Sequence, residues 1–123
     1  MLIPVDFKST EPIYMQIYWA FVGAIASGEL SAGKTLPSSR KLAADLGINY
    51  HTANKAYNLL ESEGFVGTDK KRTTVARSTG PSREDYMQRW KEMQINLITE
   101  AKAKGIRGDE MLALFRKLLE MED

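Results

Sequence analysis

The sequence predicts an α+β fold that is mainly helical, with a small N-terminal domain followed by a short two-helix region. Three features carry this prediction. Five segments repeat apolar residues at helical spacing, two β-prone segments flank the charged stretch DKKR, and a stretch rich in Ser, Gly and Pro separates the two parts. The 123 residues are enough for one compact domain with a modest core, or for a small domain plus an appendage.

The first elements are a short extended strand and a long helix. Residues 2–7, LIPVDF, are predicted to be extended, with Pro4 placing the segment at an edge or outside a central strand. Thr10 is expected to cap a helix that runs from about residue 11 to residue 27, with Pro12 in its first turn. Its apolar residues cover most of the circumference, so the helix must be covered on more than one side. One cover is the domain core, and the other is a second domain or a second chain.

Two short helices joined by a glycine turn follow the loop 28–37. Ser38 is expected to cap the first, SSRKLAADL, and Asn49 the second, which runs to about residue 63. Gly47 supplies the positive φ that the corner between them needs. The second helix repeats small and apolar residues at the spacing i, i+3, i+4, i+7, namely Ala53, Ala56, Tyr57 and Leu60. This arrangement is a helix-turn-helix.

A basic hairpin and a helical tail complete the chain. Residues 65–66 and 73–75 are β-prone and flank DKKR, which predicts a hairpin with a basic tip. We expect a winged helix-turn-helix domain over 1–77, a linker over 78–82 and a helical hairpin for dimerisation over 83–123, with helices over about 82–104 and 109–121. A lone helical hairpin this rich in Trp, Met and Leu cannot bury its own surface. It is expected to pack on the first helix, on its copy in a second subunit, or on both.

Composition excludes several classes of protein. The chain has no Cys and one His, so disulfides, thiolate zinc sites and histidine-rich metal sites are excluded, and no cofactor is expected. There is no nucleophile–base set and no glycine-rich phosphate loop, so an enzyme is disfavoured. The longest apolar run, residues 17–26, is too short to span a bilayer, and no signal peptide is visible, so a cytoplasmic protein without membrane contact is expected. The net charge is only +1, but cations gather near residues 40–41 and 70–72, and a locally basic face can bind phosphates.

The motif GxLxxGxxLPSxRxLAxxLGI over residues 28–48, followed by AYxxLExEGF over 56–65, resembles the GntR family of bacterial transcription regulators. The very short helical C-terminal region is similar to that of the YtrA-type branch. The resemblance implies a homodimer that binds a palindromic double-stranded DNA operator, usually as a repressor. The chain differs from the branch at Tyr50, where Pro is frequent, at His51, where Asn is frequent, and at the wing tip, which lacks a common Gly.

The resemblance also implies which residues touch DNA. Arg40 matches an arginine that contacts DNA, and the start of the second short helix matches the recognition helix. The residues expected to bind DNA are Ser38, Arg40, Asn49, Tyr50, His51, Thr52, Asn54, Lys55, Lys70, Lys71 and Arg72. Those expected to form the dimer are Trp19, Tyr86, Trp90, Met93, Leu97, Leu112, Phe115 and Leu119.

Two alternatives stay open. One is a winged-helix module that binds proteins and has lost DNA binding, which the near-neutral charge and the glycine-free wing tip motivate. The other concerns a small-molecule effector, for which two short helices leave little room, because ligand pockets measure at least ~300 Å³.

Overall fold

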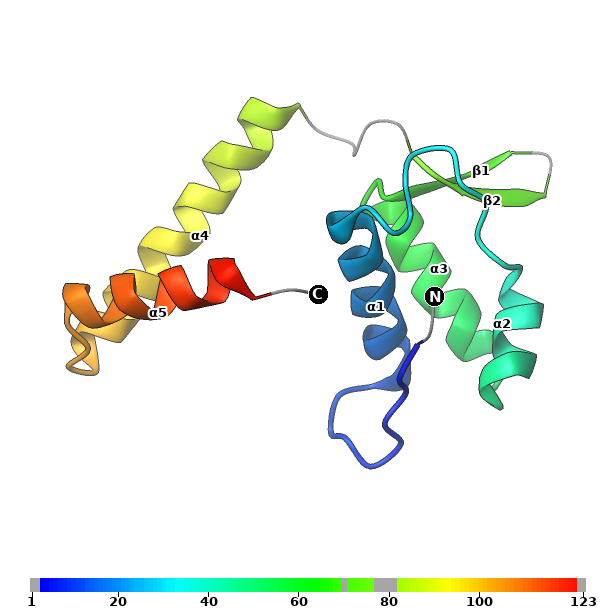
Figure 1. Cartoon of the computed structure of the whole chain (residues 1–123), viewed down its shortest axis with the longest axis horizontal. Coiled ribbons are helices and arrows are strands. Elements are labelled where there is room, and N and C mark those ends of the chain that lie inside the picture. Colours follow the sequence, from blue (N-terminus) through cyan, green and yellow to red (C-terminus); the bar gives the residue numbers. More distant parts are fainter. Residues whose placement is uncertain (1–2, 70, 77–81, 122–123) are drawn as a thin grey trace. The chain divides into compact units, whose positions relative to one another are not determined.

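The structure, a computed structural model, describes residues 3–69, 71–76 and 82–121. It divides into two compact units at about residue 80. The first unit contains the helices α1 (Ile13–Ser27), α2 (Ser39–Leu46) and α3 (Tyr50–Ser62) and the strands β1 (Val66–Asp69) and β2 (Arg72–Val75). The second contains α4 (Arg83–Ala103) and α5 (Gly108–Glu120) (Figure 1). The mainly helical α+β fold, with its helix-turn-helix, hairpin and two-helix C-terminal region, is confirmed.

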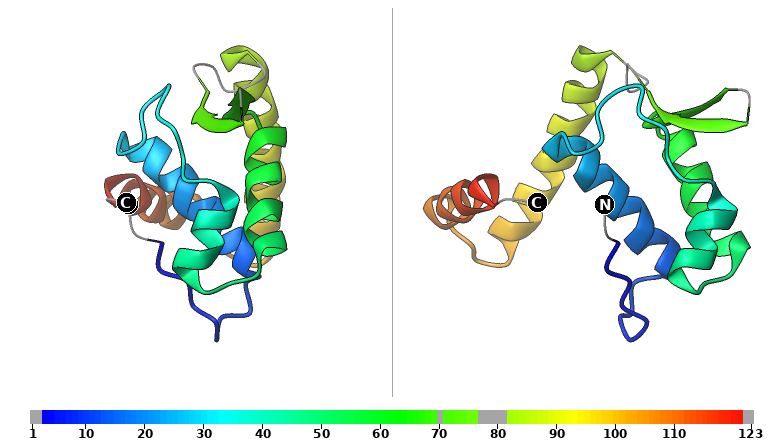
Figure 2. Two further views of the ribbon diagram at one scale, coloured as in Figure 1. Left: turned by 90° about the vertical axis from the view of Figure 1, so that its right-hand side faces the viewer. Right: turned by 45° about the vertical axis from the view of Figure 1, so that its right-hand side comes forward.

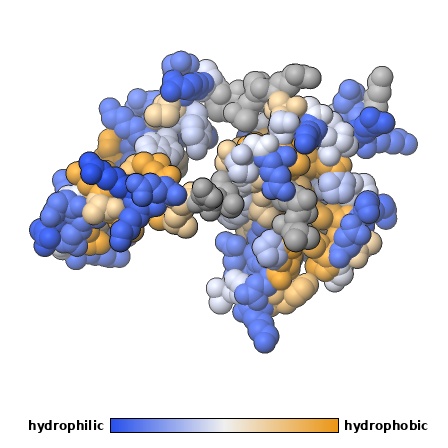
Figure 3. Space-filling model, in the orientation of Figure 1, coloured by the Kyte–Doolittle hydropathy of each residue, from blue (hydrophilic) through white to orange (hydrophobic). Residues whose placement is uncertain are grey.

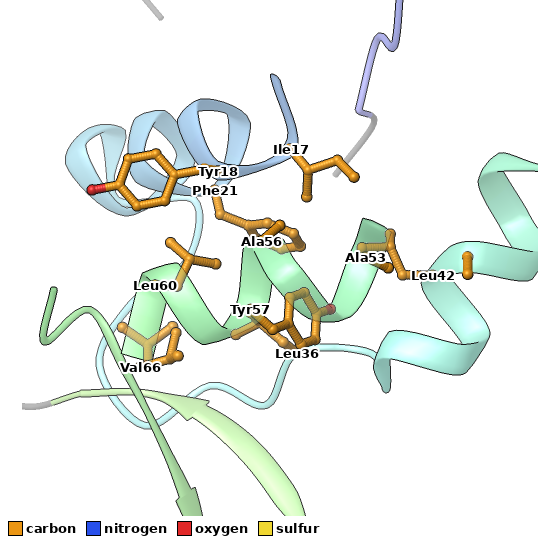
Figure 4. Close-up of a cluster of buried hydrophobic side chains, with 12 residues drawn as sticks. Ile17, Tyr18, Phe21, Leu36, Leu42, Ala53, Ala56, Tyr57, Leu60 and Val66 are labelled. Carbon is orange, nitrogen blue, oxygen red and sulfur yellow. The ribbon is translucent and has the colours of Figure 1, made fainter. Parts of the chain in front are cut away.

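The core of the first unit lies between α1 and α3. Ile17 and Leu60 are fully buried, and the rings of Phe21 and Tyr57 meet edge to face with centroids 5.6 Å apart. Figure 4 shows side chains of α1 and α3 pointing toward one another, with Leu36 and Val66 closing the cluster. The four residues predicted as the buried stripe of α3 are all buried, as the 3.6-residue period requires. Removing a buried side chain such as Leu60 should cost about 2–5 kcal/mol of stability.

The hairpin pairs β1 with β2 in antiparallel register, from Val66 opposite Val75 to Asp69 opposite Arg72. It extends beyond the C-terminal end of α3 (Figure 2). The segment before α2, which was predicted as a loop, forms main-chain hydrogen bonds with β2. The Leu36 amide donates to the Thr73 carbonyl at 2.8 Å, and the Val75 amide donates to the Lys34 carbonyl at 2.8 Å. The hairpin is therefore anchored along β2 to the chain that enters α2.

Two expectations at the N-terminus are wrong. No strand forms in residues 3–7, because the main chain there pairs with α1 and not with a sheet: the Asp6 amide donates to Gln16 Oε1 at 2.8 Å, and Gln16 Nε2 donates to the Asp6 carbonyl at 3.0 Å. Thr10 does not cap α1. The helix begins at Ile13 with Pro12 at its N-cap and no side-chain cap, since residues 9–11 form a turn in which Ser9 Oγ accepts from the Glu11 amide.

The second unit is a pair of helices joined by a turn at Gly105, whose φ of 87° favours glycine. Ser82 caps α4 by accepting a hydrogen bond from the Asp85 amide at 3.2 Å. The rings of Trp90 and Phe115 lie 6.5 Å apart between the two helices. No residue of α4 or α5 is buried in the single chain. The pair has no closed core of its own.

Candidate DNA-binding interface

The corner between α2 and α3 is built by local hydrogen bonds that follow from the sequence. Ser38 Oγ accepts from the Lys41 amide at 3.1 Å, and Asn49 Oδ1 accepts from the His51 amide at 2.7 Å, so each helix begins with a side-chain cap. Gly47 adopts φ 67°, and the following Ile48 amide donates to the Ala43 carbonyl at 3.0 Å. Ser38 and Asn49 therefore have a structural role whatever else they contact.

The first turn of α3 carries polar side chains at the surface. His51 is exposed, and Tyr50, Thr52 and Asn54 are half-buried. Ala53 behind them is fully buried, which seats the helix against the core. The main-chain N–H groups of this first turn that the Asn49 side chain does not occupy offer favourable partners for an anionic phosphate.

Arg40 and Tyr50 meet across the corner. The guanidinium carbon of Arg40, on α2, lies 4.4 Å from the ring centroid of Tyr50, at the start of α3. The ring of Tyr50 also lies 5.4 Å from that of His51. Three side chains predicted to contact DNA are therefore contiguous, although they come from two helices.

Lys55 is placed differently. Its amino nitrogen lies 4.1 Å from the ring centroid of Tyr14 on α1, so the side chain follows the edge of α3 toward α1. Tyr14 was not predicted to take part in the site. No periodicity signal could have found it, because the partners belong to helices separated by more than twenty residues.

The hairpin tip carries the remaining predicted contacts. Arg72 is exposed and pairs with Asp69 in the last step of the ladder, and Lys71 is exposed with φ 67°. Lys70 lies outside the described residues. In Figure 1 the tip projects on the side of the first unit where α2 lies and away from α1. The hairpin follows the C-terminal end of α3, whereas the α2–α3 corner lies at the N-terminal end of that helix.

The residues predicted to form the dimer leave a large apolar surface. Trp19 is 54% exposed on α1, and an open hollow runs beside it along Ala20 and Gly23. In the second unit a groove of about 570 Å³ runs between α4 and α5. Figure 3 shows hydrophobic residues at the surface of that unit among hydrophilic ones. The predicted residues there are half-buried, as for Trp90, or exposed, as for Tyr86, Met93, Leu97, Leu112, Phe115 and Leu119.

Other kinds of site are not seen in the described part of the chain. Residues 3–69, 71–76 and 82–121 contain no group of three His, Asp or Glu side chains that could hold a metal ion. Within the same ranges no helix has the length and apolar character that a bilayer crossing requires.

Comparison with known proteins gives concordant matches. The model of the family described as bacterial regulatory proteins, gntR family, matches residues 13–75. The HTH-type transcriptional repressor YtrA of Bacillus subtilis is 32% identical over 112 residues, which cover 89% of this chain and 86% of that protein. The matched region contains α1, the helix-turn-helix and the hairpin.

Two solved structures resemble nearly the whole chain. YtrA from Sulfolobus acidocaldarius, a GntR-family transcription factor, is 37% identical with a TM-score of 0.61, and the match covers 95% of this chain and 96% of that one. A structure described as a transcriptional antiterminator from Listeria monocytogenes is 26% identical with a TM-score of 0.80, covering 98% and 91%. Both matches extend over the C-terminal helices.

Proposed function

This chain belongs to the gntR family of bacterial regulatory proteins and is a DNA-binding transcription regulator, and we propose that it acts as a homodimeric repressor of a palindromic operator. The observation that carries the proposal is the α2–α3 corner. There Arg40, Tyr50 and His51 form one contiguous surface beside a capped helix start. The repressor role follows the relative from Bacillus subtilis.

The start of α3 is proposed to enter the major groove. A recognition helix reads base edges with its N-terminal residues while the preceding helix lies on the backbone. His51 is exposed and offers a donor or an acceptor to a base edge, and Arg40 offers the fork of donors that suits guanine or phosphate. Ser38, Asn49, Thr52 and Asn54 flank these two residues, and Lys55 would reach DNA from the edge next to Tyr14.

The wing is proposed to contact phosphates. Lys71 and Arg72 are exposed at the tip of a hairpin that projects on the side of α2, and Lys70 adjoins them in sequence. Each phosphate that the protein neutralises adds about 0.9 to the slope of log affinity against log salt. Lys71→Gln and Arg72→Gln should therefore each lower this slope by about one unit.

Dimerisation is proposed to proceed through the second unit, residues 83–123, with Trp19 of α1 contributing. No residue of α4 or α5 is buried in the single chain, and their exposed side chains include Leu, Met, Ile and aromatic residues among the charged ones. Burial of such surface is worth about 25 cal/mol per Å². A symmetric pair would place the two recognition helices about 34 Å apart, one turn of DNA, as a palindrome requires.

The family consists of transcription regulators, and we propose that this chain has no enzymatic activity and works in the cytoplasm, where operator DNA is found. A small-molecule effector is compatible with the groove between α4 and α5, whose volume of about 570 Å³ falls within the usual range for ligands. The groove is open, so a second copy of the chain competes with an effector for the same surface.

The decisive experiment is a mobility shift with duplexes selected from a random pool by the purified protein. The wild type is expected to bind the selected duplex specifically, with an affinity that rises as the salt concentration falls. Arg40→Ala and His51→Ala should each weaken binding to the selected duplex by about 10- to 100-fold, as expected for lost base or phosphate contacts. Lys91→Ala removes an exposed cation from α4 and serves as the charge control.

The alternative function is a protein-interaction module with a winged-helix fold. The net charge of +1 and a wing tip without glycine motivate it, whereas the family match supports DNA binding. This alternative requires that no salt-dependent duplex binding occurs even at low ionic strength. If Arg40→Ala and His51→Ala bind the selected duplex as well as wild type does, the assigned reading residues are wrong while DNA binding stands.

A further inference from the structure

We propose that Tyr50 is a positioning residue that holds Arg40 in place for DNA, an inference that rests on the proposed function. The two side chains belong to different helices, and the guanidinium carbon of Arg40 lies 4.4 Å from the centroid of the Tyr50 ring. A guanidinium over an aromatic face is attracted by the ring quadrupole. The contact therefore joins the Arg40 side chain on α2 to the first residue of α3.

Tyr50 is itself held firmly. It is half-buried, packs against the core cluster and follows the N-cap residue Asn49, whose Oδ1 accepts a hydrogen bond from the His51 amide at 2.7 Å. Its ring also meets that of His51 at 5.4 Å. An anchored ring gives a defined surface on which a long, flexible side chain can rest.

Arg40 has no other anchor among the described residues. It is exposed, and neither the ion pairs nor the side-chain hydrogen bonds of the described residues include it. Its neighbour Lys41, by contrast, pairs with Asp45 at 3.4 Å. The five N–H donors of Arg40 thus stay available for an anionic or carbonyl acceptor, while the ring restricts where they point.

Restricting Arg40 before binding lowers the entropy that is lost on binding. A long side chain loses rotamer freedom when it is immobilised at an interface, and preorganisation removes part of that loss. Tyr50 then raises affinity through Arg40, without a need for its own contact to DNA. The matching expectation is energetic coupling between the two residues in the DNA complex.

The test is a double-mutant cycle measured as the Kd for the duplex selected by wild type. Tyr50→Leu removes the ring but keeps apolar contact with the core. It should weaken binding about 3- to 10-fold when Arg40 is present and less than about 2-fold in the Arg40→Ala background. Tyr50→Phe keeps the ring, so the loss caused by Arg40→Ala should be the same in the Tyr50→Phe background as in the wild-type background, whatever the phenol oxygen itself contributes to binding.

A matched control uses the other cation–ring pair of the unit. Tyr14→Leu removes the ring beneath Lys55, and its effect on binding should be the same with Arg40 present or replaced by alanine. Circular dichroism and melting temperatures of each variant check that a general loss of fold does not produce the coupling.

Two results would overturn the role of Tyr50. Equal losses from Tyr50→Leu in both backgrounds would mean that Tyr50 touches DNA directly or only supports the fold. Tighter binding by Tyr50→Leu would mean that the ring sequesters Arg40. Absence of any salt-dependent duplex binding by wild type would overturn the proposed function together with this inference, which distinguishes the two failures.

Discussion

The phenol oxygen of Tyr57 donates a hydrogen bond to the main-chain carbonyl of Pro37 over 2.6 Å. Tyr57 lies on α3, and Pro37 directly precedes the residue that caps α2. This hydrogen bond therefore joins α3 to the chain that leads to Arg40. The ring of Tyr57 is buried and packs edge to face on Phe21, so the position of its phenol oxygen is restricted by the core.

Tyr57→Phe should lower the free energy of unfolding by about 1 kcal/mol, because the substitution removes one hydrogen bond and keeps the buried ring. Urea denaturation of the two proteins measures the difference. Affinity for the selected duplex should also fall, since the corner loses a constraint. Tyr50→Phe, which removes a phenol oxygen from the half-buried ring at the corner, is the matched control, and an equal loss of stability there would contradict this account.

The stability of the protein at high pH should depend on Tyr57. Burial raises the pKa of the Tyr57 phenol above its ordinary value of about 10. The neutral phenol is favoured in the folded state, so its contribution is complete below about pH 10 and is lost as pH rises, because the unfolded chain ionises first. The wild-type protein should lose stability above about pH 10 more steeply than Tyr57→Phe does. Parallel curves for the two proteins between about pH 9 and 11.5 would show that Tyr57 is not the titrating group.

Lys71→Gly should stabilise the hairpin. Lys71 has φ 67°, a left-handed conformation that costs a residue with a Cβ about 1 kcal/mol relative to glycine. Lys71→Gln removes the charge but keeps the Cβ, so the difference in melting temperature between the two variants isolates the backbone effect. A glycine variant no more stable than the glutamine variant would exclude strain at this position.

Leu119→Glu should convert the proposed dimer to monomers. Leu119 is 71% exposed on α5 in the single chain and does not line the groove between the two helices, so an intact helix is expected after the substitution. Sedimentation velocity at micromolar concentration measures the change, and binding to a palindromic duplex should weaken in parallel. Lys117→Gln alters the net charge by the same amount on the same helix and should stay dimeric. A wild-type protein that sediments as a monomer at these concentrations would exclude the proposed assembly.

Much of the fold was predictable because short-range chemistry determines it. The caps Ser38, Asn49 and Ser82 and the helix-ending glycines at 28, 47 and 105 act within one turn of their helix, so the sequence around each is sufficient. The buried stripe of α3 followed from its period. The strand expected in residues 2–7 does not form within residues 3–7, because β-prone residues need a partner strand and the Asp6 main chain bonds the Gln16 side chain instead.

The candidate site was predictable in composition but not in arrangement. The residues of the α2–α3 corner were identified from their motif, yet nothing local indicated that Arg40 would lie on Tyr50 or that Lys55 would lie on Tyr14. The pairing of residues 34–36 with β2 was not predicted either, although the segment KTL contains a β-branched residue between a glycine and a proline. Each of these contacts joins segments at least ten residues apart.

The amino-acid sequence by itself determined the helices, the caps of α2 and α3, the glycine corner, the basic hairpin and the family, because these depend on spacing along the chain. Tertiary structure alone decided which side chains at the α2–α3 corner contact one another. Tyr57 contacts Pro37, and Tyr50 contacts Arg40, because α2 and the segment before it pack against α3. Such contacts depend on helix orientation in space, which periodicity does not encode.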